Sequence, residues 1–337
     1  MTTEPAIWFP AVRCGTGTDV FTETLVRGLR QQGLQAEITW LPLRAEYAPW
    51  TVPAPKPPAW ANVVHINTWL HPRFIPRGLP VLATLHHSIH DPALLPYKGW
   101  ARATYHRHWI RRVECATMQR ADAVMAVSQF AADSARHHVL DRSIQVIHNG
   151  VDTERFHPPA EGTPRHPFRL LYVGSWMARK GVDLLAPIMR ELGDDFVLHY
   201  TGGKAAEKDK PGMPPNMIDL GRLSGDVVVS AMQDADALLF PSRSEGLPLG
   251  VLEAMACGLP VIGTRATAVA ELVSDGETGL LCRGEDILEF VQAAQQLASD
   301  GKLCAKMRGA SRQRVAAEFS SLSMIEKYIR QYELLAA

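Results

Sequence analysis

Short apolar runs alternate along the chain with longer segments in which apolar residues recur at helical spacing. The short runs are rich in β-branched and aromatic residues, which predicts strands, and the longer segments predict helices. Strands that alternate with helices indicate parallel sheets covered by helices, an α/β fold. The strands fall into two series, and the proline-rich segment between them, residues 153–167, is typical of a linker.

The predicted elements suggest two Rossmann-like, doubly wound parallel-sheet domains that face each other across a cleft, with ligands at the carboxyl ends of the strands. A helix at 19–33 is expected to place Val20, Leu25 and Leu29 on one face, and residues 47–60 predict a long surface loop. The predicted strands are 6–9, 36–42, 62–66, 80–86, 122–128 and 144–148 in the first series, and 169–175, 196–202, 217–221, 236–242 and 260–264 in the second.

The segment from Ser244 to Gly263 combines helix signals with an isolated pair of carboxylates. Pro248 suits a first helical turn, Gly258 suits a left-handed helix cap, and residues 260–264 read as a buried strand. On a single helix, Glu245 and Glu253 would lie about 80° apart around the axis and about 12 Å apart along it. A helix that begins near Pro248 leaves Glu245 in the loop above it, so that both carboxylates can line one cleft.

The start of this helix predicts a phosphate site, because free backbone N–H groups around Leu249 and Gly250 would point into the same cleft. Carboxylates next to a phosphate site suggest that hydroxyl groups bind there, since an ionised carboxylate accepts several hydrogen bonds. Phosphate together with hydroxyls indicates a nucleotide sugar or a similar ligand. The alternative is a plain core helix with Glu253 in solvent.

In each series, one glycine-containing loop follows the first strand. In residues 173–181, Lys180 is placed to meet a phosphate as a point charge, and Arg179 is placed to assist; the alternative is a solvated basic turn. In the other loop, Gly15 and Gly17 resemble the start of a dinucleotide fingerprint, but the bulky Phe21 leaves that fingerprint incomplete.

Two further segments each allow more than one interpretation. Residues 84–91 contain His86, His87, His90 and Asp91, which fit a metal site, turn histidines without metal, or a histidine that touches a sugar. Residues 98–120 predict a helix with an apolar stripe of Ala101, Tyr105, Trp109 and Val113 and a largely basic remainder. That helix either packs on the core with a solvated face or contacts an anionic membrane surface.

Composition and charge exclude several other classes of protein. Lys plus Arg and Asp plus Glu both number 35 in 337 residues, so there is no overall basic field that would favour nucleic acid. The five cysteines are scattered without a C-x-x-C pair, which argues against a zinc site or a disulfide framework and for a reducing compartment. The beginning of the chain carries no signal-peptide pattern, so we expect a cytoplasmic location.

Taken together, these motifs resemble a retaining glycosyltransferase of family 4 with the GT-B fold. The resemblance covers nearly the whole chain and is most specific at residues 245–281, which match the family's E-x7-E motif and the pattern downstream of it. It implies an acceptor-side domain at 1–152, a nucleotide-sugar donor domain at 153–318 with its linker at 153–167, and a helix at 319–337 that crosses back to the first domain.

The resemblance also implies a role for each matching residue. Glu253 is expected to hold the ribose hydroxyls, Glu245 to contact the donor sugar, and Lys180 to neutralise the diphosphate. Leu249 and Gly250 would offer backbone N–H groups, and His86 would lie near the sugar. The remaining donor-binding residues are expected to be Leu223 beside the base and the loop of Gly15, Thr16 and Gly17 over the diphosphate. Ser175 stands where the family often carries arginine, so either Arg179 substitutes for that arginine or donor affinity rests on Lys180 and the amides.

The implied reaction is transfer of a sugar from UDP or GDP to a glycan or lipid-linked acceptor with retention at the anomeric carbon. The leaving phosphate takes the acceptor's proton, and such enzymes generally need no metal or other cofactor, which fits the lack of a D-x-D motif. The charge that builds on the departing diphosphate then has to be met by fixed donors. Two alternatives remain, a GT-B nucleotide-sugar epimerase and a non-catalytic nucleotide-sugar binding module, and the membrane contact at 98–120 is a further expectation.

Overall fold

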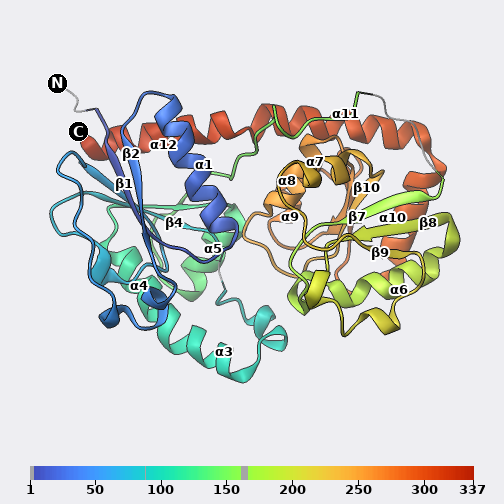
Figure 1. The fold of residues 1–337 in the computed structure, drawn as a ribbon, viewed down its shortest axis with the longest axis horizontal. Helices are drawn as coiled ribbons and strands as arrows, with labels where there is room; N and C mark the ends of the chain where they lie inside the picture. Colours follow the sequence, from blue (N-terminus) through green and yellow to red (C-terminus); the bar gives the residue numbers. More distant parts are fainter. Residues whose placement is uncertain (1–3, 88, 161–165) are drawn as a thin grey trace. The chain divides into compact units, whose positions relative to one another are not determined.

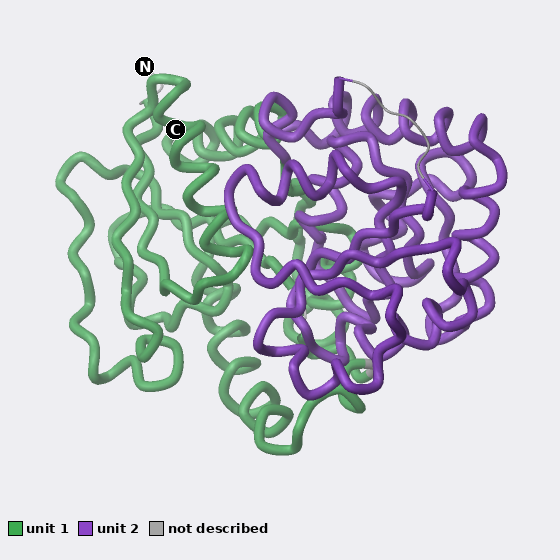
Figure 2. The backbone as a smooth tube through the Cα atoms, turned by 45° about the vertical axis from the view of Figure 1, so that its right-hand side comes forward, with its two compact units in different colours: residues 1–150, 321–337 green, residues 151–320 purple. Residues whose placement is uncertain are grey.

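The computed structural model describes residues 4–87, 89–160 and 166–337 (Figure 1). The chain divides into two compact units: unit 1 contains residues 1–150 and 321–337, and unit 2 contains residues 151–320 (Figure 2). The sequence placed the corresponding boundaries after residues 152 and 318. Part of the expected linker, residues 161–165, lies outside the described residues.

Unit 1 is built on a six-stranded parallel sheet with the order β2-β1-β3-β4-β5-β6. Each strand corresponds to one that the hydrophobic pattern predicts. The strands are β1 (Ile7–Val12), β2 (Ala36–Leu41), β3 (Val63–Asn67), β4 (Val81–Leu85), β5 (Ala123–Ala126) and β6 (Gln145–Val146), and the helices are α1 (Gly17–Gln31), α2 (Arg44–Tyr47), α3 (Trp100–Tyr105), α4 (Arg111–Arg120), α5 (Gln129–His138) and α12 (Ser321–Ala336).

Successive strand residues point to opposite faces of this sheet, so the unit has two cores. Helices α1 and α12 share one core with Ile7, Phe9 and Leu82, and α4 and α5 share the other with Trp8 and Ala83. The last helix of the chain therefore belongs to the core of the first unit.

Unit 2 repeats the architecture with the order β12-β11-β10-β7-β8-β9. Its sixth strand, β12, was not predicted, because its apolar run is very short. The strands are β7 (Phe168–Tyr172), β8 (Phe196–Tyr200), β9 (Met217–Asp219), β10 (Ala237–Phe240), β11 (Val261–Thr264) and β12 (Gly279–Cys282), and the helices are α6 (Val182–Leu192), α7 (Asp226–Gln233), α8 (Leu249–Ala256), α9 (Val269–Leu272), α10 (Ile287–Ser299) and α11 (Gly301–Glu318).

Two expectations about helix faces were wrong. Val20 is 52% exposed, whereas Leu25 and Leu29 are fully buried. Phe21 occupies the buried position instead, because a spacing of four residues keeps side chains on one face of a helix and Val20 is five residues from Leu25. In the helical stretch after Lys98, a π-helical turn at His106–Ile110 separates α3 from α4. The turn shifts the register, so Ala101 is exposed while Val113 is buried.

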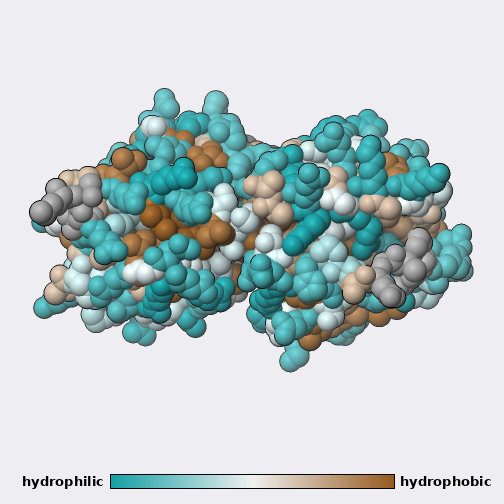
Figure 3. All heavy atoms as spheres, turned by 90° about the horizontal axis from the view of Figure 1, so that it is seen from above, coloured by the Kyte–Doolittle hydropathy of each residue, from teal (hydrophilic) through white to brown (hydrophobic). Residues whose placement is uncertain are grey.

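The loop predicted at 47–60 contains a short 3₁₀ turn at Pro49–Thr51 and begins within α2. Most side chains on the face drawn in Figure 3 are hydrophilic, with smaller groups of hydrophobic residues between them. Within the described ranges, no helix has both the length and the apolar character needed to cross a bilayer.

The packing of α1 against α12 yields a stability prediction. A Cβ added at Gly28 would lie 2.1 Å from Cδ1 of Ile325. We expect Gly28→Leu to lower the free energy of unfolding in urea by about 1–3 kcal/mol, because overpacking forces side chains and backbone to shift. Ile325→Ala in the same chain should restore part of this loss.

Gly309→Leu in α11 serves as the matched control for Gly28→Leu. A Cβ at Gly309 meets nothing within 4 Å. This substitution should be neutral, or stabilising by up to about 1 kcal/mol, since leucine favours helix over glycine. Equal stability of Gly28→Leu and the unmodified protein would show that the α1–α12 contact is looser than described.

Candidate functional site

The strand order of unit 2 reverses between β7 and β10. The chain runs outward from β7 through β8 to β9, and then returns to pair β10 with the other side of β7. Loops that follow two such strands leave the sheet in opposite directions and open a crevice at its carboxyl edge. Here those loops are residues 173–181 after β7 and 241–248 after β10, which contain four of the eight predicted site residues of unit 2.

Lys180 and Glu245 meet at this point. The Nζ of Lys180 donates to both carboxylate oxygens of Glu245, at 2.6 and 2.7 Å. The hydroxyl of Ser242 donates to the same carboxylate at 2.6 Å. Only 15% of the Lys180 side chain and 7% of the Glu245 side chain are exposed. The basic turn is therefore not simply solvated, because its lysine is buried against a carboxylate.

Helix α8 begins immediately after this loop, as predicted. Pro248 is its N-cap, Gly258 adopts φ +78° after its last turn, and β11 follows. The N–H groups of Leu249 and Gly250 lie in the first turn, where the helix itself supplies no carbonyl acceptor. The start of α8 thus offers hydrogen-bond donors next to Glu245.

Glu253 lies in the second turn of α8. Burial raises its pKa to about 6, and the charge of Arg155 opposes the increase. Glu253 is half-buried, so its carboxylate is not left fully in solvent, as the alternative has it. A partly buried carboxyl with a raised pKa is common at binding sites, where a ligand supplies hydrogen bonds that the protein does not.

The other predicted residues of unit 2 lie in the loops after β7 and β9. Arg179 donates from Nη1 to the carbonyl oxygen of Ser244 at 2.5 Å, so it ties one loop to the other. Ser175 is exposed, and its carbonyl accepts the hydroxyl of Tyr172 at 3.1 Å. Leu223 is partly exposed between β9 and α7, and β8 separates its strand from β7.

In unit 1, the glycine loop follows β1 and leads into α1. Asp19 accepts the N–H groups of Cys14 and Gly15 in its carboxylate, at 3.1 and 2.7 Å. Thr16 is the N-cap and Gly17 is the first residue of the helix. The amide of Gly15 is therefore already hydrogen-bonded to a carboxylate, and of the predicted loop only the start of α1 retains helix N–H groups without a helical acceptor.

His86 directly follows β4, and its ring packs edge-on against Phe21 of α1 at 4.6 Å between centroids. Burial lowers the pKa of His86 to about 4. The imidazole is consequently neutral at pH 7, with one nitrogen that donates and one that accepts.

The histidine-rich segment 84–91 does not gather metal ligands in the part of the chain that the structure describes, where no group of three His, Cys, Asp or Glu side chains is suited to a metal ion. His90 instead places Nε2 2.9 Å from Oε2 of the buried Glu114. The other oxygen of Glu114 accepts the hydroxyl of Thr68 at 2.8 Å.

Sequence patterns did not identify Asp19, which holds the glycine loop of unit 1. They also did not identify Ser242 and Arg243, which hold the loop after β10 in unit 2. An acidic residue in the first turn of a helix was a usable signal for Asp19. The partner of Ser242 is Glu245, three residues away, but nothing in the local sequence marks that hydroxyl. Nothing local distinguishes Arg243, because its partners Asp183 and Glu285 are distant in sequence.

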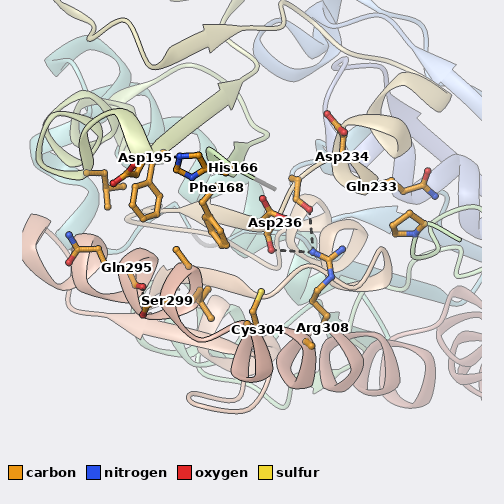
Figure 4. Close-up of a pocket in the computed structure, with 18 residues that line it drawn as sticks. His166, Phe168, Asp195, Gln233, Asp234, Asp236, Gln295, Ser299, Cys304 and Arg308 are labelled. Atoms are coloured by element: carbon orange, nitrogen blue, oxygen red, sulfur yellow. Dashed lines mark hydrogen bonds and ion pairs between the residues drawn. The ribbon is translucent and has the colours of Figure 1, made fainter. Parts of the chain in front are cut away.

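Unit 2 also contains a pocket of about 530 Å³ at the amino ends of β7, β8 and β10 (Figure 4). Phe168, Phe196 and Cys304 contribute to its walls, and Arg308 donates to the carbonyl oxygens of Ala235 and Asp236 there, each at 3.3 Å. None of the predicted site residues is among the described residues that line it. It lies at the opposite edge of the sheet from Lys180 and Glu245.

The burial of Glu253 predicts a pH-dependent stability. The pKa of Glu253 rises from 4.5 to about 6 on folding, so the folded state binds more protons than the unfolded state between these values. Stability is therefore lost as the pH rises through this window. Glu253→Gln should raise the free energy of unfolding by roughly 1–2 kcal/mol at pH 7.5 and change it little at pH 4.5.

Urea unfolding at both pH values measures this effect, with Glu277→Gln, a change at an exposed carboxylate, as the control. A Glu253→Gln variant that is less stable than the unmodified protein at pH 7.5 would mean that the carboxylate forms a stabilising contact in the unliganded state.

Two models of glycosyltransferase families match the chain. A model described as Glycosyltransferase Family 4 matches residues 59–155, and one described as Glycosyl transferases group 1 matches residues 167–300. The chain is 33% identical over 195 residues to an uncharacterized glycosyltransferase of Methanocaldococcus jannaschii, an alignment that covers 54% of each protein. The chain thus spans about half the length of this curated relative.

Solved structures share the fold over nearly the whole chain. Sucrose-phosphate synthase from Thermosynechococcus elongatus superimposes with a TM-score of 0.81 at 18% identity, over 98% of this chain and 99% of that one. HepE of Anabaena, solved in complex with UDP-glucose, superimposes with a TM-score of 0.73 at 16% identity, over 98% and 100% of the two chains. With a family 4 segment in unit 1, a group 1 segment in unit 2 and the GT-B fold, the chain belongs to the family 4 glycosyltransferases.

Proposed function

We propose that this protein transfers a sugar from a nucleotide-diphosphate sugar to a glycan or lipid-linked glycan acceptor, with retention at the anomeric carbon. The observation that carries the proposal is the contact of Lys180 with Glu245 at the switch point of unit 2, directly beside the start of α8. A cation, helix N–H groups and two carboxylates in one place match a ligand that has both a diphosphate and hydroxyl groups.

In this proposal the nucleotide lies along α8. Lys180 and the N–H groups of Leu249 and Gly250 hold the diphosphate, and Glu253 accepts hydrogen bonds from the ribose hydroxyls. Glu253 has to be ionised to accept from two hydroxyls, and its pKa of about 6 means that it is largely ionised at neutral pH. Donor affinity should therefore fall as the pH drops below 6.

The Lys180–Glu245 pair is well suited to a step in which negative charge moves onto the diphosphate. In the proposed step, the bond between the anomeric carbon and the phosphate oxygen breaks, and the acceptor oxygen bonds to that carbon on the same face. The acceptor's proton passes to the leaving phosphate. As charge grows on the phosphate, it competes more strongly with Glu245 for Lys180, so Lys180 stabilises the transition state more than the ground state.

Glu245 would remain oriented by Ser242 while Lys180 is shared, and its carboxylate would then contact the donor sugar. We propose UDP as the first donor nucleotide, supported by the UDP-glucose complex of HepE, and GDP as the second. The proposed reaction uses no resident metal, since Lys180 and the helix amides meet the charge.

The test is calorimetric binding of UDP, GDP, ADP and their sugar conjugates, followed by turnover against an acceptor panel with and without EDTA. We expect one nucleotide to be preferred and its sugar conjugate to be transferred. A new sugar epimer formed without acceptor would indicate an epimerase. Binding without turnover over a broad panel would indicate a binding module, and no binding by any nucleotide would overturn the proposed site.

Variants of the site should separate the proposed roles. Glu253→Ala is expected to weaken nucleotide binding, whereas Glu245→Ala should lower turnover more than affinity. Lys180→Ala should lower both, and it should also lower the melting temperature, because it leaves a buried carboxylate without its partner. Unchanged kinetics of Lys180→Ala, measured well below its melting temperature, would contradict the assignment.

We also propose that unit 1 contacts anionic membrane surfaces through the helical stretch 98–120 and the segment beside it. Glu114 is the one acidic residue of this stretch and is fully buried, so the charges it exposes are positive. Trp109 donates from Nε1 to the carbonyl of Glu46 at 2.9 Å, which holds the segment around Trp50 against the helix. Trp50 is 64% exposed and Trp100 is 83% exposed, and aromatic and basic side chains together suit a lipid interface.

Sedimentation with phosphatidylglycerol vesicles tests this contact. We expect binding at low salt that weakens at high salt, since surface charges are screened. Trp100→Ser and the double change Arg107→Glu with Arg112→Glu should each reduce it. Val227→Ser, at another exposed apolar residue, in unit 2, should not. No sedimentation of the unmodified protein at low salt would refute the contact.

A further inference from the structure

Arg243 lies in the loop after β10, two residues before Glu245, and only 8% of its side chain is exposed. Its guanidinium binds Asp183 through both carboxylate oxygens, at 2.6 and 2.8 Å. It also donates to both carboxylate oxygens of Glu285, one of them at 2.8 Å, and to the carbonyl oxygen of Ala178. A planar fork of donors is well matched to two carboxylates at once.

The partners of Arg243 come from three separate segments. Ala178 belongs to the 3₁₀ turn that ends at Lys180, Asp183 lies in the first turn of α6, and Glu285 follows β12. Hydrogen bonding by Arg243 holds the pKa of Asp183 below its usual value, so Asp183 stays charged at neutral pH. One side chain thus fastens the loop of Glu245 to the turn of Lys180 and to a third loop.

Backbone contacts also hold the loops after β7 and β10 close to each other. The N–H of Arg243 donates to the carbonyl of Arg179 at 3.0 Å, and the Arg179 side chain donates back to Ser244. Gly181 has φ +69°, and a Cβ there would lie 2.0 Å from the carbonyl oxygen of Pro241. The two loops are therefore in direct contact on both sides of the Lys180–Glu245 pair.

Glu285 adopts φ +66°, a backbone conformation that a residue with a Cβ rarely adopts. Such strain persists where surrounding interactions impose it. At Glu285 the carboxylate is bound by Arg243, which supplies an interaction that glycine at this position would lack.

We propose that Arg243 is a positioning residue that sets how Lys180 and Glu245 meet, by clamping the loops after β7 and β10 to each other and to Glu285. The consequence for turnover rests on the proposed function, whereas the consequence for the Lys180–Glu245 contact does not. Without the clamp the loops move relative to each other, and the amine of Lys180 is released from Glu245 for part of the time.

The first readout uses the protein alone. Lysine acetylation is followed residue by residue by mass spectrometry, with exposed Lys302 as the internal reference. We expect Arg243→Met to raise the labelling rate of Lys180 severalfold relative to Lys302. Arg169→Met is the matched control, because it removes a 2.5 Å ion pair with Asp234 at the other end of β7 and should leave Lys180 labelling unchanged.

The second readout is kcat against KM for the nucleotide sugar, measured well below the melting temperature of each variant. Arg243→Met should lower kcat by about tenfold or more, since small displacements of catalytic groups are costly. Glu285→Gly separates positioning from folding: it relieves the positive φ and removes one clamp partner. It should therefore keep the melting temperature and still lower kcat and raise Lys180 labelling.

The outcomes are distinguishable. Unchanged Lys180 labelling in Arg243→Met and in Glu285→Gly overturns the clamp, whatever the activity. If Arg243→Met does not fold, Arg243→Lys and Glu285→Gly give the same comparison. Increased labelling together with no transfer by the unmodified protein supports the clamp and refutes the proposed function. Activity that follows melting temperature alone across all variants, Arg169→Met included, also overturns the positioning role.

Discussion

The buried ion pair of Lys180 and Glu245 is the interaction on which the site of unit 2 depends. Taking two charges out of water is costly, and their mutual attraction offsets the cost only when the geometry is good and the remaining hydrogen-bond capacity is used. Here Lys180 spans both carboxylate oxygens and Ser242 provides a further hydrogen bond. Such a pair forms only if the residues that follow β7 and β10 lie close together, which the direct parallel pairing of these two strands ensures.

The same pair also affects how strongly the site attracts an anionic ligand. A lysine that is already balanced by a carboxylate is a weaker trap for a diphosphate than a free lysine, and it becomes more effective as charge grows on the ligand. The helix N–H groups at the start of α8 have no such competitor within the helix. The arrangement therefore combines donors that are always available with a cation that responds to developing charge.

Unit 1 uses a buried polar network where unit 2 uses an ion pair. His65 of β3 lies 2.6 Å from the hydroxyl of Tyr332 and 2.8 Å from that of Thr84, and Thr84 lies 3.1 Å from the hydroxyl of Tyr328. Burial lowers the pKa of His65 well below its usual value, so its ring is neutral. Because both tyrosines belong to α12, the core of the first unit includes a helix from the far end of the chain.

Local patterns were sufficient for much of the fold and for part of the site. The helix start near Pro248, the left-handed Gly258 and the strand at 261–264 follow from short-range backbone preferences, and all of them are present in the structure, with Pro248 as the N-cap and not in the first turn. Local patterns failed where a helix changed its register, as at Ala101, which precedes the π-helical turn and is exposed. They also failed where a neighbouring residue competed for the buried position, as Phe21 does with Val20.

The sequence by itself determined which residues the proposed site uses, through the spacing of Glu245 and Glu253, the position of Lys180 after a strand, and the helix that begins between the two carboxylates. Only the tertiary structure decided how these residues engage one another. The pairing of Lys180 with Glu245 and the fork of Arg243 to Asp183 and Glu285 both depend on where loops leave a folded sheet. These partners are tens of residues apart in sequence, and no local preference encodes their distance, whereas adjacent parallel strands bring their carboxyl ends to one edge.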